Sequence, residues 1–205
     1  MRAVIRPFLL VLILISATTA QQEPKEPTKP PTVTPPPSAF PPTPAWVDEM
    51  AKKQFGPEFS VVEDFYPPVL TADLDGDGVE DCVIVARSKN PLVDQQNHGY
   101  KVVDPYNGYF GFSDVKVTWN FNMQDPLRNR FLLVIHGAGA DAWRAETPKA
   151  KFVLVNIPFD RLGLTRIEYK KKTINALSTE ETSVLTSVVF WNGKKYRWEP
   201  NQAVP

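Results

Sequence analysis

The residues best suited to chemistry lie in one acidic loop, which reads Asp73-Leu74-Asp75-Gly76-Asp77-Gly78-Val79-Glu80-Asp81. Acids at loop positions 1, 3, 5 and 9 have the spacing of a calcium loop. A hard cation takes six to eight oxygen ligands, and alternate residues of a tight loop direct their carboxylates inward. The glycine at position 6 permits a sharp turn, and position 7 offers a main-chain carbonyl. The predicted metal ligands are Asp73, Asp75, Asp77, Val79 and Asp81.

The loop departs from the helical version of this site at position 12, where Ile84 stands in place of a bidentate glutamate. Without that ligand, binding weakens toward dissociation constants of roughly 10⁻⁴ to 10⁻³ M, or water or another segment completes the shell. Asp64 and Asp94 are candidates for such a segment. Clustered acids repel one another when no cation is bound. We therefore favour a structural Ca²⁺ over the alternative interpretation, an acidic turn without metal.

Residues 72–86 resemble the calcium-loop core of FG-GAP repeats, also called VCBS repeats. Such repeats form β-propeller blades in integrin α chains and in many exported bacterial proteins. The resemblance implies side-chain ligands at Asp73, Asp75, Asp77 and Asp81, a main-chain ligand at Val79, and antiparallel strands on both sides of the loop. It covers fifteen residues, and the loop has no second copy in the chain. Because a propeller needs several repeats, we expect the local corner but not a complete propeller.

A second motif, Phe131-Leu132-Leu133-Val134-Ile135-His136-Gly137-Ala138-Gly139, resembles the strand and His-Gly-x-Gly turn of α/β-hydrolase esterases. Their chemistry also needs a Gly-x-Ser-x-Gly elbow, and the nearest approach, residues 111–115, lacks the second glycine. The chain has two histidines, His98 and His136, which excludes a histidine-rich zinc site. A hydrolase that uses His136 is the alternative to a non-enzymatic module.

The segment 104–112 places four aromatic residues in a glycine-bearing loop. Exposed aromatic rings on a loop can form a platform for a protein or glycan ligand, whereas packing over the core is the alternative. The hydrolase or carbohydrate-active alternative combines this segment with His136. The aromatic residues of the last hairpin, Trp191, Tyr196 and Trp198, are interpreted as core because they alternate with charged positions.

The elements around these motifs are mainly strands. A short helix is predicted from Thr43 as N-cap and Pro44 as first residue to a stop at Gly56. Short segments rich in β-branched or aromatic residues predict strands over 69–72, 82–86, 115–121, 131–135, 152–157, 166–169 and 184–191. Asn192-Gly193 predicts a type I′ hairpin that pairs Val189 with Tyr196. Lys170-Lys171-Lys172 is interpreted as a solvated strand edge.

The first 44 residues are expected to lie outside the folded domain. Residues 1–20 combine two arginines, a short apolar run and small residues before Ala20, which predicts a cleaved secretory signal, with an uncleaved anchor as the alternative. Residues 21–44 contain ten prolines and few apolar side chains, which predicts a disordered tether. Removal of the signal leaves 21 basic and 23 acidic residues, so no nucleic-acid partner is indicated.

These observations predict one antiparallel, mainly β domain over 45–205 with a short N-terminal helix. The lone cysteine, Cys82, lies in an apolar stretch and is interpreted as a small buried hydrophobe, so the fold depends on its core rather than on disulfides. We expect an exported, non-enzymatic calcium-binding module, periplasmic, cell-surface or extracellular, with no stable membrane span after signal cleavage. Its role would be to bind or scaffold an unknown protein or glycan.

Overall fold

The structure, a computed structural model, describes residues 44–121, 123–125 and 128–201. The predicted signal peptide and nearly all of the predicted tether lie outside these residues. Within the described part of the chain, no helix combines the length and the apolar character needed to cross a bilayer.

The described chain is built on two sheets, which confirms the predicted mainly β fold. The first sheet has the order β1-β3-β5-β6-β4, with β2 also paired to β3, and the second has the order β10-β9-β8-β7. Every strand pair in the described residues is antiparallel except β4 with β6. The strands are β1 (Phe59–Val61), β2 (Val69–Ala72), β3 (Asp81–Ser88), β4 (Lys101–Val103), β5 (Phe131–His136), β6 (Ala150–Leu154), β7 (Arg161–Tyr169), β8 (Lys172–Glu180), β9 (Thr186–Trp191) and β10 (Tyr196–Pro200).

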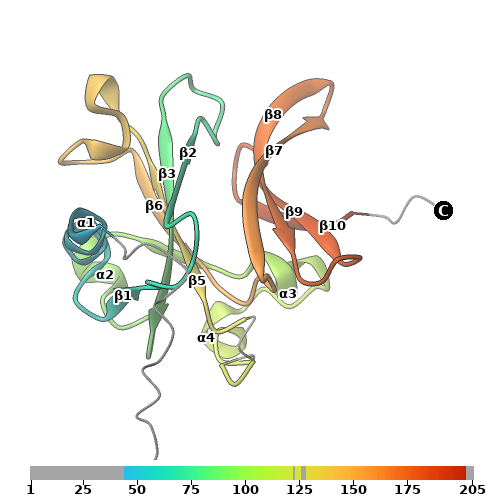
Figure 1. The fold of residues 1–205 in the computed structure, drawn as a ribbon, viewed down its shortest axis with the longest axis horizontal. Coiled ribbons are helices and arrows are strands. Elements are labelled where there is room, and N and C mark those ends of the chain that lie inside the picture. The colour runs from blue at the N-terminus through green and yellow to red at the C-terminus, as the bar shows by residue number, and fades with distance from the viewer. Residues whose placement is uncertain (1–43, 122, 126–127, 202–205) are drawn as a thin grey trace, which may run out of the picture. The chain divides into compact units, whose positions relative to one another are not determined.

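Short helices connect and cover these strands. They are α1 (Ala45–Phe55), α2 (Gln95–His98), α3 (Pro105–Tyr109), α4 (Val115–Thr118) and the 3₁₀ helix η1 (Gly139–Arg144). The helices α1 and α2 lie on one side of the first sheet, and the second sheet lies on the other side (Figure 1).

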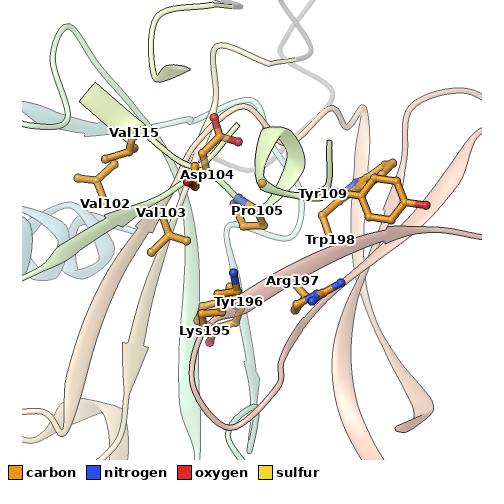
Figure 2. A pocket seen from close by; sticks show the side chains of 12 residues that line it. Val102, Val103, Asp104, Pro105, Tyr109, Val115, Lys195, Tyr196, Arg197 and Trp198 are labelled. Atoms are coloured by element: carbon orange, nitrogen blue, oxygen red, sulfur yellow. The ribbon is translucent and has the colours of Figure 1, made fainter. Parts of the chain in front are cut away.

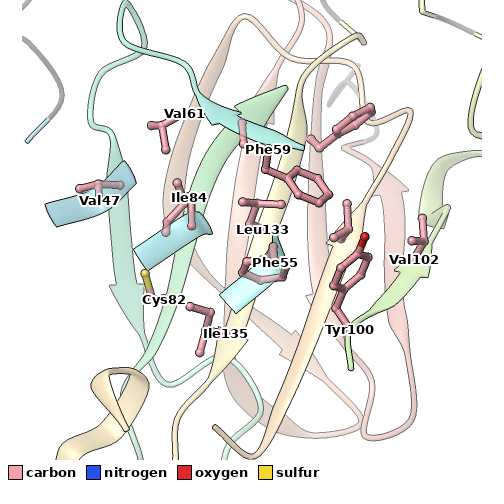
Figure 3. Close-up of a cluster of buried hydrophobic side chains, with 14 of the residues drawn as sticks. Val47, Phe55, Phe59, Val61, Cys82, Ile84, Tyr100, Val102, Leu133 and Ile135 are labelled. Atoms are coloured by element: carbon pink, nitrogen blue, oxygen red, sulfur yellow. The ribbon is translucent and has the colours of Figure 1, made fainter. Parts of the chain in front are cut away.

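The core has two layers because the central strand β5 is buried on both faces. Leu133 and Ile135 pack with Val47 and Phe55 beneath α1, as Figure 3 shows. Leu132 and Val134, on the opposite face, pack against side chains of the second sheet. Since successive side chains of a strand point to opposite faces, a strand with apolar residues at every position fits this central place.

The predicted N-terminal helix is confirmed, but it begins one residue later than expected: α1 starts at Ala45, and Pro44 takes the capping position predicted for Thr43. Val47 and Ala51 are fully buried. The helix stops at Gly56, whose φ of 103° is left-handed and whose N–H donates to the Lys52 carbonyl. The helix therefore ends in a backbone conformation that glycine adopts without steric cost.

The predicted strand over 115–121 is wrong, because the structure has helix α4 at its start. The Asp114 side chain accepts a hydrogen bond from the Lys116 N–H and caps this helix. A capping aspartate thus outweighs the strand preference of the valines that follow.

The run Lys170-Lys171-Lys172 is exposed, as interpreted, but two of its residues form a turn instead of lying along a strand edge. Lys170 and Lys171, with φ of 49° and 64°, form the tight turn between β7 and β8, and Tyr169 pairs with Lys172. Sequence reasoning missed the nine-residue strand β8 altogether, because positive φ at lysine is uncommon.

The last hairpin exists, but its register differs from the prediction by two residues. Tyr196 pairs with Trp191, and Trp198 pairs with Val189. The Asn192 side chain accepts from the N–H groups of Lys194 and Lys195. The predicted two-residue type I′ turn is therefore wrong: residues 192–195 form the turn, with positive φ at Gly193 and not at Asn192. The strand β10 is an edge strand as predicted.

Candidate metal centre

The acidic loop joins β2 to β3, and Ala72 pairs with Asp81 where it begins and ends. The antiparallel strands expected on both sides of the loop are therefore present. The ends of β5 and β6 lie beside the same corner, because Cys82 pairs with Ile135 and His136 pairs with Ala150. Four strand ends thus position one loop.

Asp73, Asp75 and Asp81 converge, with one carboxylate oxygen from each lying within 4.8 Å of the others. Both oxygens of Asp73 also close the loop, because Oδ1 accepts from the Gly76 N–H at 2.8 Å and Oδ2 from the Gly78 N–H at 2.9 Å. The backbone of these two glycines has φ of 79° and 86°, a conformation that residues with a Cβ rarely adopt. Three of the four predicted aspartate ligands therefore meet at one point.

Asp81 is the buried member of this triad, with 1% of its surface exposed. Its Oδ2 accepts from the Leu74 N–H at 2.7 Å, and its Oδ1 accepts from the Gly137 N–H at 2.8 Å. Burial raises the pKa of Asp81 to about 6, although these amide hydrogen bonds pull it down. An ionised carboxylate at this depth is stabilised by nearby positive charge.

Asp77 faces a different partner. Its Oδ2 lies 2.6 Å from the Lys149 ammonium, which also lies 2.7 Å from Oδ2 of Asp75. The hydrogen bond from Lys149 lowers the pKa of Asp77, and the two carboxylates hold the pKa of Lys149 above its usual value. The ammonium of Lys149, the residue before β6, therefore compensates two of the predicted metal ligands.

His136 connects the loop to the core. Its Nδ1 lies 3.2 Å from Asp75 Oδ2, and its Nε2 lies 2.7 Å from the Tyr196 hydroxyl. Burial lowers the pKa of His136, and Asp75 opposes that shift. Burial also raises the pKa of Tyr196 well above its usual value. The pair of His136 and Tyr196 therefore ties Asp75 to the second sheet.

Two further contacts hold the loop from outside. The Asn175 side chain, on β8, donates to the Asp73 carbonyl at 2.7 Å. Glu80 accepts from the Trp143 indole at 2.8 Å, and Trp143 stacks on Trp46 of α1. Local patterns in the sequence carry no signal for Lys149, Asn175 or Trp143, because each reaches the loop from a segment more than sixty residues away.

The two remaining predicted ligands are the Asp77 carboxylate and the main-chain carbonyl of Val79. Asp77 lies outside the converging triad, and the carbonyl of Val79 stays a prediction. Val79 donates its N–H to Asp77 Oδ1 at 2.8 Å. Asp64 and Asp94 are not members of the triad: Asp64 lines a separate cavity with Arg130, and Asp94 lies beside Asn97 at α2.

The donor set fits a hard divalent cation. Three carboxylates from the loop present oxygen atoms to one point, as Ca²⁺ or Mg²⁺ requires. Thiolate ligands of the kind that soft metals prefer are not available there, because the thiol of Cys82 is fully buried in the core beneath α1. That burial confirms the interpretation of Cys82 and raises its pKa to about 12.

The esterase-like motif is arranged differently from an oxyanion hole. The Gly137 N–H, which an oxyanion would need, donates to Asp81 instead. The two nitrogens of His136 contact Tyr196 and Asp75 rather than a serine or cysteine. These contacts give His136 a structural setting beside the acidic loop.

Comparison with known proteins found no match among family models, curated proteins or solved structures. What the structure shows at the loop is the cluster of Asp73, Asp75 and Asp81, which could hold a metal ion.

Proposed function

We propose that this chain is an exported, non-enzymatic module in which a Ca²⁺ ion bound by the loop at 73–81 stabilises the fold. The observation that carries the proposal is the convergence of Asp73, Asp75 and Asp81. The ion would hold the β2–β3 corner, with the carbonyl of Val79 and Asp77 as additional ligands. A role in binding or scaffolding fits a stabilised β domain that a proline-rich segment precedes.

The proposed cation competes with Lys149. The Lys149 ammonium lies 2.6 Å from Asp77 Oδ2. It must move away from that oxygen before Asp77 can join the site. Lys149 is half-exposed, so its release into water is inexpensive, because exposed ion pairs contribute only about 0.2–1 kcal/mol. Lysine therefore compensates the acids without blocking the divalent ion.

Calcium is expected to raise the melting temperature of the full chain. A ligand that binds only the folded state stabilises it by RT ln(1 + [L]/Kd), which amounts to about 1–2 kcal/mol at 5 mM Ca²⁺ for the weak affinities expected here. Thermal unfolding in 5 mM Ca²⁺ and in a chelator measures the shift, and calorimetric titration measures uptake.

Asp75→Asn should abolish the calcium-dependent shift. Asp141→Asn is the matched control, because it removes the same charge from exposed η1 and leaves the triad intact. Equal melting temperatures in calcium and chelator, together with no heat of binding, would exclude the proposed role of the cation.

Export is tested separately from the metal. Expression of the full chain in a secreting host is expected to yield a mature protein that begins at Gln21. Mass spectrometry of the purified protein identifies its N-terminus, and an intact Met1–Ala20 segment would contradict cleavage.

A further inference from the structure

Aromatic side chains gather on one surface, which is remote from the acidic loop in sequence. Tyr106, Tyr109 and Phe110 of the α3 region surround Trp198 of β10, with ring centroids 4.9, 5.3 and 6.2 Å from the Trp198 ring. We call these four residues the aromatic surface. Tyr109 and Phe110 are 47% and 54% exposed. Contiguous exposed apolar groups on a folded domain are typical of interaction sites.

A cavity of about 160 Å³ opens beside these rings. Tyr109 and Trp198 lie on one side of it and Val102 and Val115 on the other, with Lys195 and Arg197 at its border (Figure 2). A cavity of about 150 Å³ holds a single six-membered ring. This cavity therefore accepts one ring of a larger ligand, while the rest of the ligand lies across the surface.

The polar groups around the cavity are rich in donors. The Trp198 Nε1 is buried and has no hydrogen-bond partner among the described residues. Lys195 and Arg197 add donors that carry positive charge, and Arg197 lies 3.5 Å from Glu199. A buried N–H without an acceptor is costly, so a shift of the neighbouring rings that admits a ligand carbonyl to it is favoured.

Asp104, the acid that lines the cavity, is buried and engaged in hydrogen bonds within the chain. Asp104 accepts hydrogen bonds from the backbone and side chain of Asn107 at 2.9 and 2.8 Å, and from Asn156 at 2.6 Å. These bonds cap α3 and hold the loop that carries the aromatic rings. Asp104 therefore positions the surface instead of contacting a ligand.

We propose that the aromatic surface binds a proline-rich segment of a partner polypeptide that carries acidic residues near its prolines. Proline has a carbonyl but no N–H, so such a segment offers acceptors without donors and complements the Trp198 Nε1. Its polyproline II conformation is formed before binding and packs on aromatic grooves. Its acidic residues face Lys195 and Arg197.

A glycan fits these groups less well. Sugar hydroxyls donate hydrogen bonds as well as accept them, and the oxygens of side-chain carboxylates or amides normally accept the bonds that they donate. The buried carboxylate of Asp104 already accepts three hydrogen bonds from Asn107 and Asn156. The observed chemistry therefore favours the peptide, and the glycan becomes an outcome of the test.

This inference rests on the binding role proposed above, because it names the class of ligand. It is independent of the cation, since none of the cavity-lining residues belongs to the acidic triad. Titrations with and without Ca²⁺ separate the two: peptide binding in both conditions supports the inference even when calcium has no effect on stability.

The test uses the full chain and a synthetic peptide of ten prolines with a glutamate at each end. Isotope-edited NMR follows the indole N–H signals, and Trp198→Phe identifies the signal of Trp198. We expect the peptide to shift that signal, and Trp198→Phe, which removes the N–H but keeps a ring, to weaken binding about fivefold, as the loss of one hydrogen bond implies. Tyr109→Ala removes an exposed ring and should weaken binding at least tenfold.

Tyr66→Ala is the matched control, because Tyr66 is 63% exposed and lines a different cavity. It should bind the peptide like the original chain. No movement of the Trp198 signal at millimolar peptide, or equal affinities in Tyr109→Ala and Tyr66→Ala, would overturn the proposal. A shift of that signal by neutral oligosaccharides instead of the peptide would overturn it in favour of a glycan ligand.

Discussion

At the scale of single residues, the acidic loop shows how a chain holds several carboxylates together. Backbone amides satisfy Asp73 and Asp81, and the ammonium of Lys149 bridges Asp75 and Asp77. Repulsion between like charges is thus reduced before any metal binds. The loop is arranged in advance for a cation, and lysine competes with that cation for two of the oxygens.

Lys149→Met is expected to tighten Ca²⁺ binding about two- to fivefold, because it removes the ammonium that competes for the partly exposed Asp77. In a chelator the same variant should be less stable than the original chain, because Asp75 and Asp77 lose their positive partner. Calorimetric titration and thermal unfolding measure the two effects.

Lys151→Met is the control for that experiment, since the Lys151 ammonium donates to the carbonyl of Gln54 and not to the loop. Its calcium affinity should equal that of the original chain. Weaker calcium binding in Lys149→Met would mean that the lysine supports the ion instead of competing with it.

Cys82 provides a test of burial at a single residue. Its thiol is fully buried, and its pKa of about 12 keeps it protonated at neutral pH. Because thiolate is the reactive form, a thiol reagent at pH 8 should modify Cys82 only in denaturant. Rapid labelling of the native chain, followed by mass spectrometry, would contradict the packing beneath α1.

At the scale of elements, the corner depends on how closely the end of β5 approaches the acidic loop. The Gly137 N–H bonds to Asp81, and a Cβ on Gly137 would lie 2.4 Å from the Glu80 carbonyl oxygen. The glycine in the His-Gly-x-Gly motif is therefore explained by packing against the acidic loop and η1. Sequence reasoning associated it with an oxyanion hole because the motif does not reveal which strand lies beside it.

Gly137→Ala should destabilise the fold by about 1–3 kcal/mol, as overpacking does, and should weaken calcium binding by moving Asp81. Gly108→Ala is the matched control, because no atom lies within 4 Å of its added Cβ and alanine is favoured in a helix. Chemical unfolding compares the two. Equal stability of both variants would show that the corner tolerates the added methyl group.

At the scale of the whole molecule, the first sheet is central to both cores. The side chains of β5 alternate between the layer beneath α1 and the layer against the second sheet. Tyr196 connects the core to the acidic loop, because its ring packs between the sheets and its hydroxyl contacts His136 beside the loop. Loss of packing on either face should therefore affect the molecule as a unit.

Leu133→Ala and Leu132→Ala, on opposite faces of β5, test whether the two layers of the core unfold together. Both leucines are fully buried, so each variant should lose about 2–5 kcal/mol while unfolding remains one transition. Calorimetry measures the transitions. A second, separate transition in Leu132→Ala, which faces the second sheet, would show that the two sheets unfold independently.

The sequence by itself determined the mainly β class, the helix that ends at Gly56, the central strand β5 and the acidic corner. These features follow from local rules: side-chain alternation, glycine at positive φ, and the spacing of aspartates within one loop. Local rules predicted wrongly where two of them competed, as at Asp114, where a capping carboxylate overcame the strand preference of valine.

Only the tertiary structure decided which groups meet. Lys149, His136 and Asn175 reach the acidic loop from distant segments, and Trp198 reaches the rings of α3 across the chain. The physical reason is that strand pairing and sheet packing bring together residues that are far apart in sequence. The compensating lysine and the unpartnered indole therefore have no counterpart in any local pattern.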